Sequence, residues 1–185
     1  MGRVLGVVGS PRWNGNTHIL VSRILDGARE AGAATDLTFL ADLRIRECDG
    51  CHTCWHGRPC AKPDDMHSLY DRIAVSDAIV FGTPVYWYGP TALMKAFIDR
   101  FVYFNCPENR PKIRGKTVVL AIPFEEADAE TAAPVVAFFE RCAAYLEMRL
   151  AGTVLAPGVA KRGDVLERET CLEKARAIGR GLVEA

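Results

Sequence analysis

Short apolar runs alternate with amphipathic stretches along the whole chain. Each of the five runs has the length and composition of a strand that is buried on both faces. The predicted strands are Val4–Val8, Thr35–Leu40, Ala78–Gly82, Lys116–Ile122 and Leu150–Leu155. Helical periodicity follows each strand, and it predicts helices over about 17–32, 66–76, 91–105, 129–146 and 165–183.

This alternation predicts a parallel sheet covered by helices on both faces, with right-handed crossovers. Five strands fit the flavodoxin-like order 2-1-3-4-5, a three-layer α/β/α sandwich. We therefore expect residues 1–185 to form a single domain, with a cysteine-rich insertion at about 41–65. Ligands in such sheets bind beyond the carboxyl ends of the strands, at the switch point between the first and third strands.

The loop after the first predicted strand is rich in neutral hydrogen-bond donors. It contains Ser10, Asn16 and Thr17 with one cation, Arg12. It lacks the Gly-Lys-Ser/Thr ending of a triphosphate loop and the Gly-x-Gly-x-x-Gly of a dinucleotide loop. The helix that follows offers unpaired N–H groups and the positive end of its dipole, which suits a single phosphate. The alternative is an ordinary turn with a capping Asn or Thr.

The loop after the third predicted strand is aromatic. Tyr86, Trp87 and Tyr88 follow one another between Pro84 and Pro90. Three consecutive side chains cannot all enter one core, so some of them face solvent, a ligand or a second subunit. Backbone donors fixed by the prolines beside aromatic surface suit a flat heteroaromatic ring such as an isoalloxazine. An aromatic dimer patch is the alternative, and the two interpretations are compatible.

Charge and hydropathy narrow the class of protein. The formal net charge is zero and the sequence pI is about 6.9, which argues against a general nucleic-acid binder or a binder of acidic membranes. No apolar run approaches the length that spans a bilayer. Because Met1 leads almost directly into the first predicted strand, we expect no signal peptide. We therefore expect a cytoplasmic protein, in which the seven cysteines are thiols or metal ligands.

Four of these cysteines form a compact motif, C-x₂-C-x₂-C-x₅-C. They are Cys48, Cys51, Cys54 and Cys60, and Gly57 gives the chain freedom to turn before the last one. The first three match the spacing of bacterial ferredoxins, so all four are candidate ligands of one [4Fe–4S] cluster. Bare thiols are the second interpretation. Zinc is the third, because zinc usually takes two well-separated C-x₂-C pairs. The segment follows the second strand, so we expect it on the ligand side of the sheet.

Together these motifs resemble the NAD(P)H-dependent FMN reductase superfamily, and the cysteine segment resembles its iron–sulfur flavoprotein branch. The resemblance covers nearly the whole chain, including Lys95–Arg100 after the aromatic loop. It implies non-covalent FMN and a homodimer or a tetramer of dimers. It places Ser10, Arg12, Asn16 and Thr17 at the FMN phosphate and Pro84, Val85, Tyr86, Trp87 and Gly89 in the loop along the flavin ring. A third flavin-side loop is expected at 123–127, where the usual glycines are missing, and its residues stay unassigned.

The expected activity is that of an FMN-dependent NAD(P)H oxidoreductase of the flavin- or quinone-reductase type, with a [4Fe–4S] cluster as an additional centre. Its partners would be a nicotinamide cofactor and a small electron acceptor. The chemistry belongs to the cofactor, so no side chain is assigned as a catalytic acid or base. One alternative is an iron–sulfur flavoprotein electron carrier or redox sensor that ferredoxin reduces. Another is a binding protein that has kept the fold and lost the flavin.

Overall fold

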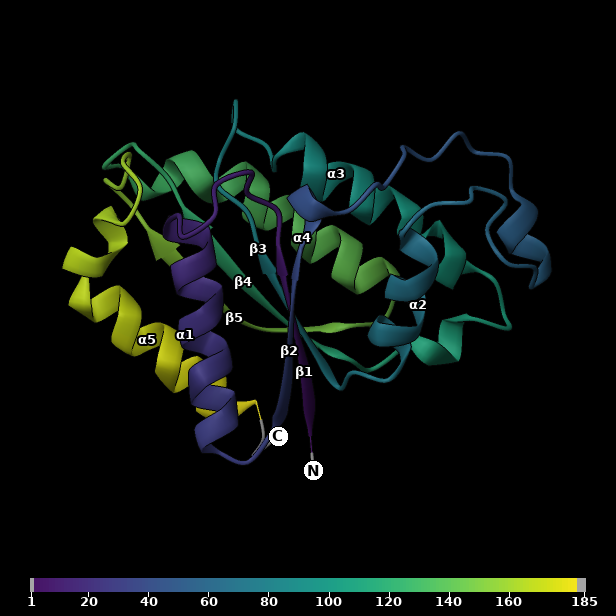
Figure 1. Cartoon of the computed structure of the whole chain (residues 1–185), viewed down its shortest axis with the longest axis horizontal. Helices are drawn as coiled ribbons and strands as arrows, with labels where there is room; N and C mark the ends of the chain where they lie inside the picture. Colours follow the sequence, from purple (N-terminus) through teal and green to yellow (C-terminus); the bar gives the residue numbers. More distant parts are fainter. Residues whose placement is uncertain (1, 183–185) are drawn as a thin grey trace.

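The computed structural model of the chain describes residues 2–182 and contains one five-stranded, all-parallel sheet (Figure 1). The strands are β1 (Arg3–Val8), β2 (Ala34–Phe39), β3 (Ala78–Gly82), β4 (Thr117–Pro123) and β5 (Arg149–Ala156). Their spatial order is β2-β1-β3-β4-β5, and in this register Val8 of β1 lies beside Gly82 of β3. The predicted flavodoxin-like order is therefore confirmed.

Helices cover both faces of the sheet (Figure 1). The α-helices are α1 (Asn16–Glu30), α2 (Met66–Ala74), α3 (Ala92–Asp99), α4 (Ala133–Tyr145) and α5 (Glu169–Gly181). Helices α1 and α5 pack on one face, and α2, α3 and α4 pack on the other. Within the described residues, no helix is both long enough and apolar enough to cross a bilayer.

Alternation along β1 shows how the strands serve two cores. Leu5 and Val7 face α2, α3 and α4, whereas Val4 and Val8 face α1 and α5. All four side chains are buried, because a parallel strand between two helical layers has no solvent face. This is why the strands appear in the sequence as continuous apolar runs.

Three predicted helices are shorter than their hydrophobic periodicity indicates. The helix expected at 129–146 begins as the 3₁₀ turn η5 (Ala129–Ala132) and is α-helical only over α4. The helix expected at 91–105 is α-helical only to Asp99 and continues as the 3₁₀ helix η3 (Arg100–Asn105), and Pro107 prevents further continuation. The helix expected from Val165 begins at Glu169, after the 3₁₀ turn η6 (Asp164–Glu167). There the Val165 N–H donates to the Asn16 side chain, a tertiary contact that local periodicity cannot reveal. The predicted end at Val183 lies outside the described residues.

Candidate functional site

The phosphate-type loop after β1 and the aromatic loop after β3 meet at the carboxyl edge of the sheet. The Gly9 N–H donates to the Gly82 carbonyl at 2.7 Å, and the Thr91 hydroxyl, which caps α3, donates to the Gly9 carbonyl. Both loops open into one pocket, of about 110 Å³, at the switch point between β1 and β3. Its lining includes Ser10, Arg12, Gly15, Asn16, Thr17, Pro84, Val85 and Tyr86.

The loop after β1 leaves the start of α1 open toward this pocket. Gly15 is the N-cap residue and supplies no side-chain acceptor, so neither Asn16 nor Thr17 acts as the cap. The first N–H groups of α1 therefore remain available to a ligand, and the helix dipole favours an anion there. Ser10 and Thr17 are almost fully buried, and the Ser10 hydroxyl accepts the Arg12 N–H at 3.2 Å.

The Asn16 side-chain amide, however, is hydrogen-bonded entirely within the protein. Its Nδ2 donates to the Lys161 carbonyl at 2.9 Å and to the Val159 carbonyl at 3.3 Å. Its Oδ1 accepts the N–H groups of Gly163 at 3.0 Å and Val165 at 3.2 Å. These four bonds use the hydrogen-bonding capacity of the amide. Asn16 thus holds the loop between β5 and α5, and only its backbone N–H remains for the phosphate role that sequence analysis expects.

The loop between β5 and α5 and the end of β4 contribute pocket residues that sequence analysis does not assign. They are Val159, Ala160, Arg162, Pro123, Phe124 and Glu125. Arg12 Nη1 donates to the Ala160 carbonyl at 3.1 Å and so ties the two phosphate-side loops together. The contacting residues are more than 140 positions apart, so no local pattern indicates the contact. The local signal in the sequence is the pair of glycines in this loop, Gly158 and Gly163, and both have positive φ in the structure.

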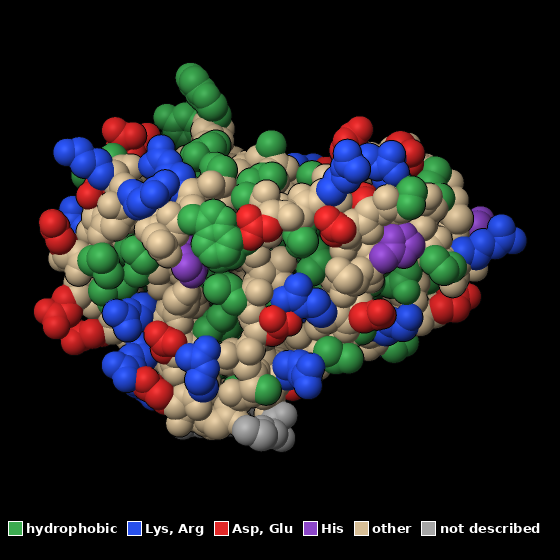
Figure 2. Space-filling model, viewed as in Figure 1, with side chains coloured by type: hydrophobic (Ala, Val, Ile, Leu, Met, Phe, Trp, Pro, Cys, Tyr) green, Lys and Arg blue, Asp and Glu red, His purple; other side chains and the backbone are tan. Residues whose placement is uncertain are grey.

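The aromatic loop is a tight turn that carries two bulky residues in left-handed conformation. Tyr86 and Gly89 exchange both backbone hydrogen bonds, at 2.9 and 3.0 Å. Between them, Trp87 has φ 49° and Tyr88 has φ 59°, the geometry that Asn-Gly normally occupies in a type I′ turn. Trp87 is 97% exposed, and Figure 2 shows hydrophobic side chains projecting where Figure 1 places this loop. Strain of this kind gathers at ligand-binding positions.

A second hollow, of about 250 Å³, lies beside the same turn and is lined by Val85, Trp87, Tyr88, Glu126 and Thr131. Val85 borders both this hollow and the first pocket. The surface therefore changes from polar and cationic at the α1 end to aromatic at the turn. That gradient suits a ligand with a phosphate at one end and a flat ring at the other.

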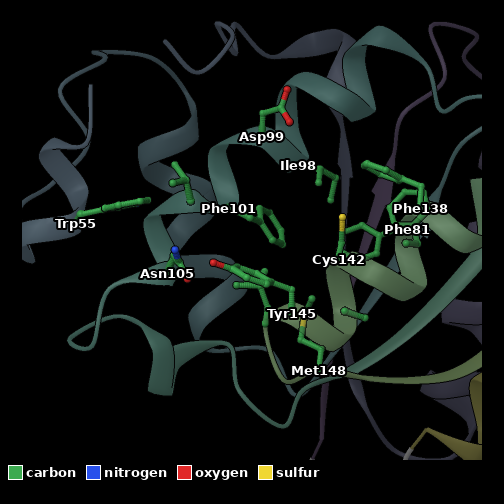
Figure 3. A pocket seen from close by; sticks show the side chains of 14 residues that line it. Trp55, Phe81, Ile98, Asp99, Phe101, Asn105, Phe138, Cys142, Tyr145 and Met148 are labelled. Carbon is green, nitrogen blue, oxygen red and sulfur yellow. The ribbon is translucent and has the colours of Figure 1, made fainter. Parts of the chain in front are cut away.

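The cysteine segment lies away from this pocket. None of residues 43–65 lines the pocket, and the 3₁₀ helix η2 (Thr53–His56) instead packs against η3. The segment follows the carboxyl end of β2 and so leaves the sheet on the expected side, but it does not reach the pocket. Trp55 of this segment borders a separate apolar cavity of about 340 Å³, between η3 and α4, with Cys142 and Tyr145 on its other side (Figure 3).

The four motif thiols are free, and they differ in burial, from the buried Cys54 to the exposed Cys51. Burial, and then the Cys60 thiol, raises the pKa of Cys54 to about 11, and Cys48 and Cys51 act in the same direction. Among residues 2–182, no group of three or more His, Cys, Asp or Glu side chains is arranged to hold a metal ion. All four motif donors are cysteine sulfurs, a donor set that would suit iron–sulfur chemistry.

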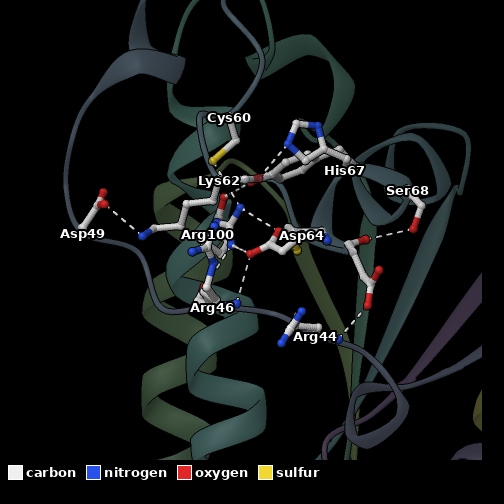
Figure 4. Close-up of polar contacts among 12 residues, drawn as sticks. Arg44, Arg46, Asp49, Cys60, Lys62, Asp64, His67, Ser68 and Arg100 are labelled. Carbon is white, nitrogen blue, oxygen red and sulfur yellow. Dashed lines mark hydrogen bonds and ion pairs between the residues drawn. The ribbon is translucent and has the colours of Figure 1, made fainter.

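The segment is tied to the core by a buried ion pair (Figure 4). Arg100 Nη1 lies 2.6 Å from Asp64 Oδ2, and both side chains are almost completely inaccessible. Burial by itself would raise the pKa of Asp64, but the hydrogen bond from Arg100 lowers it overall. At the surface, Lys62 pairs with Asp49 at 2.9 Å.

The parallel sheet, the switch-point pocket and the open start of α1 define a mononucleotide-binding α/β protein. The family model for NADPH-dependent FMN reductase matches residues 2–163, and the chain belongs to this family.

Curated relatives agree with this membership. An iron–sulfur flavoprotein of Archaeoglobus fulgidus is 27% identical, with 98% of this chain and 94% of the relative aligned. A second one from the same organism is 33% identical over 62% of this chain and 50% of the relative. The chain spans about half the length of this second relative and of a similar protein from Methanocaldococcus jannaschii. A putative NAD(P)H-dependent FMN-containing oxidoreductase of Bacillus subtilis is 24% identical over 94% of both chains.

Solved structures support the fold. A flavone reductase superimposes with a TM-score of 0.76 at 22% identity. The superposition covers 99% of this chain and 62% of the flavone reductase chain. An azoreductase from Bacillus anthracis gives a TM-score of 0.73 at 18% identity, with 98% and 100% covered.

Proposed function

We propose that this protein is an FMN-dependent NAD(P)H oxidoreductase of the flavin- or quinone-reductase type. The observation that carries the proposal is the single pocket into which the Ser10–Thr17 loop and the Pro84–Gly89 loop both open. Polar groups and an open helix start lie at one end of it, and aromatic surface lies at the other. Those are the requirements of a singly phosphorylated ring cofactor.

At the phosphate end, the proposed ligands are the Ser10 and Thr17 hydroxyls, the Arg12 guanidinium and the first N–H groups of α1, including that of Asn16. Arg12 and Arg162 supply two positive charges against one carboxylate, Glu125. This balance, together with the helix dipole, favours a dianionic phosphate.

At the ring end, Pro84, Val85, Tyr86, Trp87 and Gly89 present an apolar edge. The donors proposed for the ring are the Val85 and Trp87 N–H groups, because those of Tyr86 and Gly89 donate to each other's carbonyl groups. Val85 borders both hollows, so a ring that leaves the first pocket over Val85 would reach the open 250 Å³ hollow. Bound FMN would supply hydride and single-electron chemistry. The protein binds and orients the cofactor, and the open hollow leaves room for a nicotinamide donor or a small acceptor in turn.

The test is direct. The purified protein, stripped of flavin, is titrated with FMN and with riboflavin, and flavin fluorescence is followed. We expect stoichiometric FMN binding, much weaker riboflavin binding, and NAD(P)H oxidation with a quinone acceptor by the loaded protein. Equal affinity for the two flavins would contradict the phosphate site, and a protein that takes up neither would refute the function.

We also propose that Cys48, Cys51, Cys54 and Cys60 hold a [4Fe–4S] cluster. The support is the motif spacing, the all-cysteine donor set, and the relatives that are named iron–sulfur flavoproteins. This observation favours a second candidate function, an electron carrier or redox sensor that a ferredoxin-type donor reduces. We further propose a cytoplasmic homodimer or tetramer, as the family resemblance implies.

Anaerobic purification separates these functions. Four iron atoms per chain with FMN but negligible NAD(P)H oxidation would favour the carrier. Iron-free yellow protein that oxidises NADPH would favour the plain reductase and refute the cluster. Cys54→Ser should abolish iron binding and leave FMN binding intact, because the cysteine segment does not line the flavin pocket.

A further inference from the structure

Arg100 is the largest fully buried side chain of the described residues, although it is charged. It begins η3, directly after α3, and its counter-ion Asp64 is equally inaccessible. Charged side chains are almost never fully buried without a partner. Even with one, the cost of removing both charges from water makes a buried pair a poor device for stability alone. The pair therefore calls for an explanation beyond stability.

The same guanidinium also contacts both ends of the cysteine segment. Its Nη1 donates to the Arg46 carbonyl at 2.9 Å, two residues before Cys48. Its Nη2 donates to Cys60 Sγ, the last thiol of the motif, at 3.2 Å. Asp64 reinforces this arrangement, because its Oδ2 accepts the Arg46 N–H at 3.0 Å. Figure 4 shows Arg100 between Cys60, Asp64 and Arg46.

We propose that Arg100 is a positioning residue of the cysteine motif: it fixes Cys60 through an N–H···S hydrogen bond and joins the two ends of the segment that would hold the cluster. The inference rests on the cluster proposed above. Its consequence for redox chemistry follows from the same contact. A cationic donor on a ligating sulfur offsets the negative charge of the reduced cluster, so it raises the reduction potential.

Only arginine can make this set of contacts. The planar guanidinium presents several N–H groups in a fixed fork, whereas an ammonium is a single compact donor centre. Arg100→Lys therefore keeps the positive charge beside Asp64 but cannot reach Asp64, the Arg46 carbonyl and Cys60 Sγ together. This variant therefore distinguishes the effect of the guanidinium geometry from the effect of its positive charge.

The experiment compares wild type, Arg100→Lys and a matched control, Tyr70→Phe. The Tyr70 hydroxyl donates to the Arg100 carbonyl at 3.2 Å, so the control removes a buried hydrogen bond of the same residue while the guanidinium and its contact with Cys60 Sγ stay in place. Anaerobically purified proteins are compared for FMN per chain, iron per chain and the midpoint potential of the cluster. Hydrogen exchange of residues 44–64 is measured on iron-free protein.

For Arg100→Lys we expect full FMN content, together with either loss of iron or a lower cluster potential. Hydrogen exchange across 44–64 should be about tenfold faster, the change expected from losing one hydrogen bond to a charged donor. Tyr70→Phe should behave as wild type in all of these measurements. A variant with unchanged iron, potential and exchange would overturn the inference while the cluster stands.

If wild type binds no iron, the cluster proposal fails, and hydrogen exchange alone then decides whether Arg100 orders the segment. If Arg100→Lys does not fold, Arg100→Gln combined with Asp64→Asn replaces it, because this pair leaves no uncompensated buried charge. Unchanged exchange and an unchanged potential in that double variant would likewise refute the role of Arg100.

Discussion

Replacing Asn16 with alanine separates two roles that this residue is able to play in flavin binding. The side-chain amide makes four hydrogen bonds to the backbone of residues 159–165, and three of them are partly buried. If the amide acts only by holding this loop, Asn16→Ala should damage the loop first and the flavin site second. If it binds phosphate directly, the damage to the flavin site should come without a large loss of stability.

The magnitude follows from the bonds themselves. Each side-chain hydrogen bond contributes about 0.5–1.5 kcal/mol net, and water replaces the exposed one, so three partly buried bonds amount to about 2–4 kcal/mol. Alanine recovers about 0.5 kcal/mol because it is a better helix former than asparagine. We therefore expect the free energy of unfolding to fall by about 1.5–3.5 kcal/mol, measured by urea denaturation of the flavin-free protein.

The effect on the flavin site is tested with a double-mutant cycle. Arg162 lines the pocket from the loop that Asn16 holds. We expect Arg162→Ala to weaken FMN binding by roughly twofold to fivefold, as for one exposed charged contact. In the Asn16→Ala background it should have little further effect, because the loop no longer holds Arg162 at the pocket. FMN affinities from flavin fluorescence provide the measurement.

Two results would refute this reasoning. Strictly additive losses in the cycle would mean that Asn16 and Arg162 act independently. A large loss of FMN affinity with an unchanged free energy of unfolding would mean that the amide binds phosphate itself, as the sequence resemblance implies.

Three further changes test other parts of the site. Trp87→Asn combined with Tyr88→Gly should stabilise the protein by about 1–2 kcal/mol, because Asn and Gly suit the left-handed positions of this turn, and it should weaken FMN binding. If urea denaturation shows no gain in stability, the turn is not strained. Gly82→Ala should destabilise the protein by about 1–3 kcal/mol, because a Cβ there collides with the Val21 side chain and lies 2.9 Å from Thr17 Cγ2. A urea denaturation midpoint equal to that of wild type would contradict this packing. Burial lowers the pKa of His18 below its usual value of 6.5, so the unfolded chain binds more protons and stability should fall as the pH drops through about 6.5. His18→Asn should reduce this loss between pH 7.5 and 5.5, and an identical pH dependence in both proteins would count against the contribution of His18.

The sequence by itself determined the sheet and the position of the pocket. Continuous apolar runs such as Val4–Val8 must be buried on both faces, and the alternation of five such runs with helices leaves few topologies. Strand order then brings the loops that begin at Gly9 and Thr83 to one edge. These conclusions depend only on local periodicity and on the general handedness of crossovers.

Only the tertiary structure decided what the individual polar side chains do. Asn16 turns from the expected phosphate toward residues 159–165, and Arg162 enters the pocket from a loop with no recognisable motif. Arg100 belongs to an ordinary amphipathic pattern, yet it is buried against Asp64 and Cys60. Each of these contacts joins segments between 36 and 149 residues apart. A hydrogen bond depends on positions in space to within a fraction of an ångström, and local sequence patterns do not encode positions at that distance along the chain.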